Sequence, residues 1–531
     1  MGAATLASRV LGLLRDTVLA NLFARSVTDA FFLAFMLPNL LRRLVGEGSL
    51  TTAFVPVFTG WLRRSRDEAR RAFNATWTLS AAVGVGITLA GVALADPLVS
   101  LFAPGFASSP GKHELTVDLL RLCFPYILFM ILLSVAMGAL NAAGHFLTPA
   151  IAPVLLNLAL IAAAFAGAAW LGVPAIALGW GVLAAGVAQA ALQIGPLRRL
   201  GLSPRPLWDP RHPALERLGR LMGPAVLGAS VFQLNLLVNR FLASFQGDGA
   251  VSYLYYADRM LELPLGLFVL ALGTASLPSF SRLAKRGDRD GLRAAFSGTL
   301  SLSLALAVPS TVGLIALREE IFTALFRWNP QVFTRDAVEA CSLALWLYAL
   351  GLVPIALSRL FVNLCIAHED TRTGARAAVA SLAANALASL ALIGPLPHGA
   401  LPGWFVELQH RWVVADLGFA GLALASSLAA GVNALYVMAR ARARHGAALD
   451  RADLEGAARI ALASAAMAAA VLGLAHALPV GEVASLRGLA LLALHVAAGA
   501  AVYLGALVAL RGPEPARLAL LLRLERTPPE E

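Results

Sequence analysis

The sequence predicts an all-α integral membrane protein with about fourteen transmembrane helices. Of its 531 residues, 59% are hydrophobic and only 14% are charged, and the mean hydropathy is +0.74. A soluble protein of this size cannot hide so much apolar surface, so lipid surrounds most of the chain. The apolar runs are far longer than the strands of a membrane barrel, and a helix satisfies its own backbone hydrogen bonds in lipid. Helices are therefore the expected spanning elements.

The expected spans are apolar stretches of the length that crosses a bilayer, which takes about 20 residues. They occupy residues 3–24, 30–61, 73–103, 116–142, 149–171, 175–196, 221–245, 250–281, 294–317, 338–366, 376–394, 417–439, 458–477 and 486–510.

Positive charge indicates the orientation of these spans. Arg and Lys concentrate after even-numbered spans, in the stretches 63–71, 198–211, 282–289 and 440–444. Connections after odd-numbered spans hold only scattered positive residues such as Lys112. Because cytoplasmic loops carry the excess of Lys and Arg, we expect both termini in the cytoplasm. The net charge of +11 then reflects membrane topology, and no nucleic-acid partner is expected.

A weak internal repeat suggests two lobes. Residues 53–58 read AFVPVF and residues 275–280 read ASLPSF, and the pair His145/Thr148 matches His368/Thr371 at nearly the same offset. The offset covers six helices, so the two halves would share one orientation. The expected parts are an N-terminal lobe (1–200), a linker (201–220), a C-terminal lobe (221–445), two extra helices (446–512) and a cytoplasmic tail (513–531).

Charged residues interrupt the first two spans and the eighth. They are Arg9, Arg15, Asp16, Asp29, Arg42, Arg43 and Glu47 at the N-terminus, and Asp258, Arg259 and Glu262 in the eighth span. One charge at the centre of a spanning helix costs about 2.5–3.5 kcal/mol on insertion scales. Such a cluster is expected to face a polar cavity or to pair internally.

Each charge also has a plainer interpretation. Arg9 could reach the membrane surface, Arg15 and Asp16 could form a structural pair, and Arg42 and Arg43 could simply end a helix. An Arg259–Glu262 pair could stabilise its own lobe.

The excess of arginines favours an anionic ligand that carries phosphate, since guanidinium groups bind phosphate with two parallel hydrogen bonds. The histidines lack metal-ligand spacing, the three cysteines lie in apolar stretches, and no nucleotide-binding or hydrolase motif is present. No metal, no cofactor and no enzymatic activity are therefore expected. A membrane enzyme acting on polyprenyl phosphates would need clustered Asp or His near a membrane face.

Several motifs resemble those of the MurJ (MviN) lipid II flippases, members of the multidrug/oligosaccharidyl-lipid/polysaccharide (MOP) exporter superfamily. They are ASRVLGLLRD at 7–16, TDAFF at 28–32, LPNLLRRL at 37–44, AFVP at 53–56 and YYADRMLE at 255–262.

The resemblance implies a flippase that moves the undecaprenyl-diphosphate-linked peptidoglycan precursor between leaflets of the bacterial inner membrane by alternating access. Arg9, Arg15, Arg42 and Arg259 fall on the family's substrate-binding arginines, and Asp29 and Glu262 fall on its acidic positions. The last two helices would hold the lipid tail. Lipid II and membrane lipids would be partners, and the cell-wall synthesis machinery is a further candidate. The alternative is an exporter of another lipid-linked oligosaccharide.

One residue and three spans depart from the family pattern. Met36 stands where a basic residue is common, and spans 7, 11 and 12 contain no acidic residue in their interiors. Without acidic residues in these three spans, the acidic sodium site described for some members of the family is not supported here. An ion gradient and the membrane potential both stay open as the driving force.

Overall fold

The computed structural model describes residues 2–43, 51–170, 174–399, 401–446 and 450–512. These residues form helices, and the described part contains no β-strand beyond one isolated bridge between Ile393 and Asp416. Within the described residues, ten helices are long and apolar enough to cross a membrane, judged by length and composition. The predicted class, an all-helical membrane protein, is confirmed at this level.

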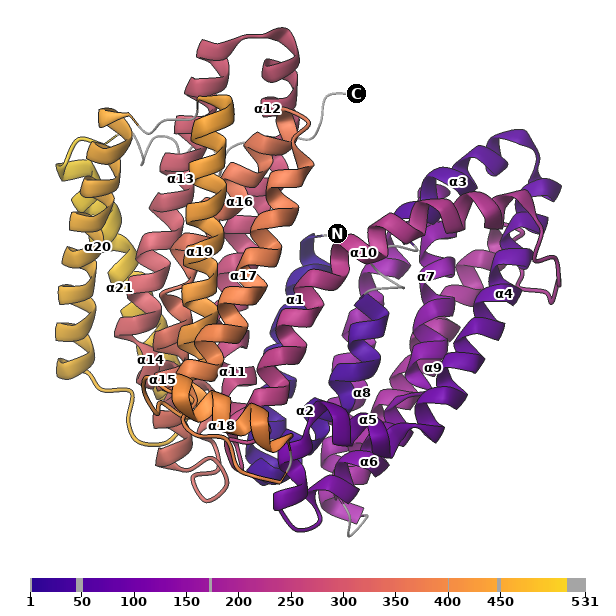
Figure 1. The fold of residues 1–531 in the computed structure, drawn as a ribbon, viewed down its shortest axis with the longest axis horizontal. Helices are drawn as coiled ribbons and strands as arrows, with labels where there is room; N and C mark the ends of the chain where they lie inside the picture. Colours follow the sequence, from indigo (N-terminus) through magenta and orange to yellow (C-terminus); the bar gives the residue numbers. More distant parts are fainter. Residues whose placement is uncertain (1, 44–50, 171–173, 400, 447–449, 513–531) are drawn as a thin grey trace. The chain divides into compact units, whose positions relative to one another are not determined.

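The described chain divides into two compact units, residues 1–252 and 253–531 (Figure 1). The helices of the first unit are α1 (Gly2–Leu22), α2 (Arg25–Leu41), α3 (Thr51–Arg64), α4 (Arg66–Ala93), α5 (Ala95–Phe102), α6 (Lys112–Cys123), α7 (Tyr126–Ala142), α8 (Leu147–Trp170), α9 (Pro174–Arg199) and α10 (Pro213–Ala243), with a short 3-10 turn at Pro104–Ser108.

Helix α11 (Ala250–Pro264) crosses the boundary between the units, and a π-helical turn (Leu265–Val269) follows it. The other helices of the second unit are α12 (Leu270–Arg286), α13 (Arg289–Ala316), α14 (Arg318–Phe326), α15 (Arg335–Ala349), α16 (Leu352–Ala367), α17 (Thr371–Leu392), α18 (Gly403–Trp412), α19 (Phe419–His445), α20 (Arg451–Ala477) and α21 (Leu486–Ala509).

The predicted linker 201–220 is fastened to α4 within the first unit. The backbone N–H groups of Arg205 and Leu207 donate to the side chains of Asn74 and Thr78, at 3.1 and 2.8 Å. Arg70 Nε, also on α4, donates to the carbonyl oxygen of Gly201 at 3.0 Å. The boundary between the compact units falls further along, after residue 252, so the lobe limits drawn from the sequence stay a prediction.

Four expected spans are not among the ten candidate spans of the described part: 3–24, 30–61, 221–245 and 250–281. Three of these stretches carry the charges singled out above. The stretch 30–61 contains α2 and α3, and the stretch 250–281 contains α11, the π-helical turn and α12. In 250–281 the charges therefore lie beside a π-helical turn, a feature that is frequent at functional sites.

At one edge of the second unit, α20 and α21 lie side by side against α13 (Figure 1). Their shared core includes Ile460, Met467 and Val471 of α20 and Tyr503 of α21. The Tyr503 hydroxyl donates to the carbonyl oxygen of Ala305 on α13 at 2.8 Å. Gly499 of α21 permits this approach, because an added Cβ would lie 2.7 Å from a methyl carbon of Val471.

Candidate functional site

The charged face of α1 contains one satisfied arginine. Arg15 donates to Asp16 Oδ1 from Nε at 2.9 Å and from Nη2 at 2.5 Å, and Nη1 donates to Asn157 Oδ1 of α8 at 3.2 Å. Asn157 in turn donates to the carbonyl oxygen of Ser8 at 3.0 Å. Both charged side chains are buried. The alternative that Arg15 and Asp16 form a structural pair therefore describes this conformation.

Arg9 lies on the same helix but differs from Arg15 in the hydrogen bonding of its guanidinium group. Its Nη1 is buried and has no hydrogen-bond partner among the described residues. A buried donor of this kind normally finds a partner, because leaving it unpaired costs about 1–3 kcal/mol or more for a charged group. Helix α1 thus holds one arginine paired with Asp16 and a second whose Nη1 has no hydrogen-bond partner among the described residues.

The end of α2 carries the next pair of arginines. The helix continues through Pro38 to Leu41, and Arg42 follows it with helical backbone angles. Arg42 Nε donates to Asn39 Oδ1 at 2.8 Å, and Arg42 and Arg43 are both half-buried. Glu47 and the glycines beside it lie outside the described residues.

Asp29 lies near the start of α2 and is fully buried. Its Oδ2 accepts from Lys112 Nζ at 2.9 Å and from the backbone N–H of Gly249 at 2.7 Å. Its Oδ1 accepts from the backbone N–H and the hydroxyl of Ser252, at 2.8 and 2.6 Å. Lys112 also donates to Asp248 Oδ1 at 2.7 Å. These contacts, here called the Asp29 clamp, tie α2, the start of α6 and the start of α11 together.

The sequence placed Lys112 among the scattered positive residues of the connections and assigned it no partner. Lys112 is buried, begins α6 and lies over the ring of Phe106, with Nζ 4.2 Å from the ring centroid. Asp29 has a full set of protein partners, so its charge is matched within the first unit. From the sequence, Lys112 could have been predicted as the ion-pair partner of Asp29 only if the packing of α2 against α6 had been known.

In α11 the eighth-span charges form a local pair. Arg259 Nη1 donates to Glu262 Oε2 at 2.8 Å, and both side chains are partly exposed. Asp258 is half-buried one position earlier. The alternative of an Arg259–Glu262 pair within one helix is the arrangement observed.

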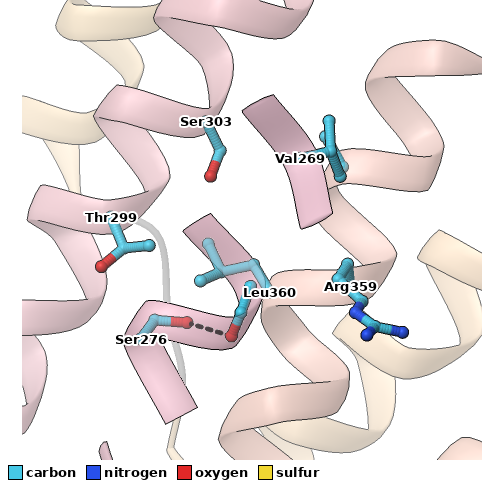
Figure 2. A pocket seen from close by; sticks show the side chains of 8 residues that line it. Val269, Ser276, Thr299, Ser303, Arg359 and Leu360 are labelled. Atoms are coloured by element: carbon cyan, nitrogen blue, oxygen red, sulfur yellow. Dashed lines mark hydrogen bonds between the residues drawn. The ribbon is translucent and has the colours of Figure 1, made fainter. Parts of the chain in front are cut away.

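A small pocket in the second unit lies at the π-helical turn, and Arg359 of α16 borders it (Figure 2). Figure 2 shows the side chains of Ser276, Thr299 and Ser303 on one side and Arg359 on the other. Ser276 Oγ donates to the carbonyl oxygen of Gly273 at 3.1 Å. Asn363 Nδ2 donates to the same carbonyl oxygen at 2.7 Å. Because two donors converge on one carbonyl oxygen, these polar groups brace α12 against α16.

Comparison with solved structures shows what fold this chain has. A structure titled as an inward-facing multidrug resistance MATE family transporter of the MOP superfamily matches with a TM-score of 0.65 at 14% identity, covering 83% of this chain and 94% of that chain. A structure titled lipid II flippase MurJ, inward closed conformation, matches with a TM-score of 0.72 at 23% identity, covering 95% and 97%. The fold is therefore that of the MOP transporters.

Sequence comparison then defines the family. The family model described as lipid II flippase MurJ matches residues 19–487. A probable lipid II flippase MurJ of Bdellovibrio bacteriovorus is 36% identical over 82% of this chain and 80% of its own length. The lipid II flippase MurJ of Burkholderia cenocepacia is 37% identical over 75% and 78%. The chain belongs to the lipid II flippase MurJ family, which is a transporter family, and it is a multi-pass protein of the bacterial inner membrane.

Proposed function

We propose that this chain flips the undecaprenyl-diphosphate-linked peptidoglycan precursor, lipid II, from the inner to the outer leaflet by alternating access. The observation that carries the proposal is the buried Arg9 Nη1, which has no hydrogen-bond partner among the described residues. A diphosphate supplies the acceptor oxygens that such a group lacks, and guanidinium groups bind phosphate oxygens in pairs. The family membership supplies the identity of the lipid.

The proposed division of labour follows from the pairing of each arginine. Arg9, Arg15, Arg42 and Arg259 bind the diphosphate and the head group, and Asp16, Asp29, Arg43, Glu47, Asp258 and Glu262 support them. Asp16 holds Arg15 in position through two hydrogen bonds. Glu262 accepts a hydrogen bond from Arg259. Substrate phosphate would exchange with this carboxylate, so that Arg259 keeps an anionic partner throughout.

The proposed architecture has fourteen spans in two six-helix lobes. The bounds of the helices support the repeat. Helices α4 and α13 begin at Arg66 and Arg289, and both are 28 residues long. Pro56 in α3 and Pro278 in α12 occupy matching positions within their helices. The segments Lys112–Ala142 and Arg335–Ala367 are two further matching spans, and each contains a break between two helices. If α1, α2–α3, α10 and α11–α12 are counted as spans, the positive-inside distribution supports a cytoplasmic location of both termini.

We further propose that α20 and α21 form the groove for the polyprenyl tail. They lie outside the repeat and pack on α13. Large apolar side chains on both helices stay exposed, among them Leu462, Leu472, Leu494 and Val508. Exposed apolar surface of this kind suits a long hydrocarbon chain or bilayer lipids. The flipped precursor would then reach the cell-wall synthesis machinery on the outer side.

The test is a depletion–rescue assay that scores lipid II exposed on the outer leaflet. Arg9→Ala should insert and accumulate like the wild type but leave lipid II on the inner leaflet. The matched control is Arg451→Ala, which removes an arginine whose side chain is 93% exposed and pairs with Glu455. The control should flip lipid II normally.

Normal flipping by a well-expressed Arg9→Ala variant would refute the role given to the unpaired guanidinium. Failure of the wild type to rescue would point to a different lipid-linked oligosaccharide as the substrate.

A further inference from the structure

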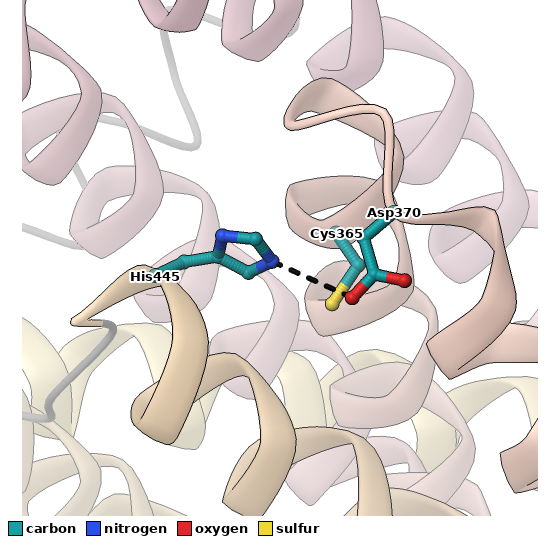
Figure 3. Close-up of side chains that lie close together, drawn as sticks. All are labelled: Cys365, Asp370 and His445. Carbon is teal, nitrogen blue, oxygen red and sulfur yellow. Dashed lines mark ion pairs between the residues drawn. The ribbon is translucent and has the colours of Figure 1, made fainter.

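Three potential metal ligands meet where α16, α17 and α19 come together in the second unit. Cys365 lies near the end of α16, Asp370 caps the start of α17, and His445 is the last residue of α19. Their ligand atoms all lie within 4.8 Å of one another (Figure 3). His445 is distant from the other two residues in the sequence, so motif spacing could not reveal the group.

His445 supplies the second observation. Its Nε2 is buried, lies 3.7 Å from Asp370 Oδ2 and has no hydrogen-bond partner among the described residues. Figure 3 shows the imidazole directed at the Asp370 carboxylate, with the Cys365 sulfur beside it. A buried ring nitrogen without a hydrogen bond is unfavourable, whereas a metal ion would use its lone pair.

We propose that Cys365, Asp370 and His445 bind a zinc ion or a similar divalent transition metal. Zn²⁺ accepts thiolate, imidazole and carboxylate ligands at about 2.0–2.3 Å in tetrahedral geometry. Tetrahedral ligands at those distances lie about 3.5 Å apart, so the side chains would close by about 1 Å. The charges of a thiolate and a carboxylate balance the ion, and water occupies the fourth position. A sulfur ligand favours Zn²⁺ over Mg²⁺ or Ca²⁺.

Arg444 competes with the metal for Asp370. Its Nη1 donates to Asp370 Oδ2 at 2.9 Å, and Thr373 Oγ1 donates to the same oxygen at 2.7 Å. The Arg444 side chain is 43% exposed, so it can turn into solvent when a cation arrives. His368 stacks on His445 with ring centroids 4.3 Å apart and is held by the carbonyl oxygen of Leu364. That stack fixes the plane of the His445 ring.

A metal ion here would cross-link the turn between α16 and α17 to the end of α19. The link would restrain these helix ends relative to one another, in the way that a metal clip stabilises a loop. The inference rests on the local geometry of the second unit and is independent of the lipid that is carried.

The experiment uses the purified full chain in detergent, freed of metal by a chelator and titrated with Co²⁺. Tetrahedral Co²⁺ bound to a thiolate absorbs in the visible and near-ultraviolet, so the spectrum reports both sulfur ligation and affinity. The wild type should bind one equivalent, and Zn²⁺ should bleach the spectrum. Cys365→Ser and His445→Gln should each weaken binding about tenfold or more and, for Cys365→Ser, remove the sulfur-to-metal band.

Two matched variants sharpen the test. Cys341→Ser alters another buried cysteine and should leave the spectrum unchanged. Arg444→Gln removes the competing charge and should tighten Co²⁺ binding about two- to fivefold. A wild type without the tetrahedral spectrum would overturn the proposal, and so would a spectrum that survives in both Cys365→Ser and His445→Gln.

Discussion

Two acidic residues of this chain, Asp29 and Glu262, show opposite ways of holding a charge in a membrane protein. Asp29 is fully buried and accepts four hydrogen bonds, from Lys112, Gly249 and two donors of Ser252. Glu262 is 45% exposed on its side chain and pairs with Arg259 one turn away. The sequence grouped both with the same set of cavity charges.

The comparison shows that partners, and not residue type, decide what a membrane charge can do. In the folded protein, fixed protein donors replace the water molecules that would hydrate the Asp29 carboxylate. Losing one donor therefore leaves a buried charge less well compensated. The Arg259–Glu262 pair keeps contact with solvent and is worth about 1 kcal/mol or less. A pair of that kind can open for a substrate anion at little cost, whereas the Asp29 clamp is suited to holding α2, the start of α6 and residues 248–252 together.

The largest expected effect is therefore on the Asp29 clamp. Asp29→Ala or Lys112→Ala should lower the free energy of unfolding by about 3–5 kcal/mol, because the first leaves the buried Lys112 with Asp248 as its remaining carboxylate partner and the second leaves the buried Asp29 carboxylate without a cation. Thermal unfolding of the detergent-purified chain measures the loss. Glu262→Ala is the matched control and should change stability by about 1 kcal/mol or less.

A double variant tests whether the two clamp residues act as a pair. Asp29→Ala combined with Lys112→Ala should cost clearly less than the sum of the single changes, because no uncompensated charge remains between them. Additive losses would show that the two residues do not depend on each other and would contradict the clamp.

The second-largest expected effect is that of changing Arg259, which should impair transport but leave stability nearly unchanged. Arg259→Ala should unfold within about 1 kcal/mol of the wild type and yet lose outer-leaflet exposure of lipid II, because we propose that this arginine binds the diphosphate. Arg335→Ala is the matched control, since Arg335 is an exposed arginine paired with Glu339 on its own helix at 3.2 Å. Equal flipping by both variants would assign Arg259 a structural role only.

A smaller effect should follow from the partner of Arg259. Glu262→Gln keeps the shape of the side chain but removes the charge that competes with the substrate for Arg259. Lipid II should then bind more tightly and leave more slowly, so flipping should fall by less than in Arg259→Ala. Flipping as low as that of Arg259→Ala, measured in the same assay, would show that the carboxylate does more than compete.

The sequence could predict the properties of single segments, such as helix formation and membrane spanning. It predicted fewer of the contacts between segments that are distant in the sequence. Mean hydropathy and run length predicted an all-helical membrane protein, because lipid imposes the same requirement on every span. The local motif around Arg259 even suggested its pairing with Glu262, three positions on. The Asp29–Lys112 contact and the Cys365–Asp370–His445 group were missed, because they depend on helix packing that brings separated segments together.

The smallest expected effect concerns a carboxylate outside the spans, Asp370, and it is a dependence on pH. Hydrogen bonds from the Thr373 hydroxyl, and then from its backbone N–H and from Arg444, hold the pKa of Asp370 below its usual range against the opposing effect of burial. A carboxylate with a lowered pKa in the folded state stabilises the fold above its unfolded pKa of about 4, and this contribution is lost as the pH falls. In chelator-treated protein, Asp370→Asn should therefore flatten the decline of thermal stability below about pH 5 while keeping the helix cap. An unchanged decline of stability at acid pH in Asp370→Asn would show that Asp370 does not contribute to the response to acid.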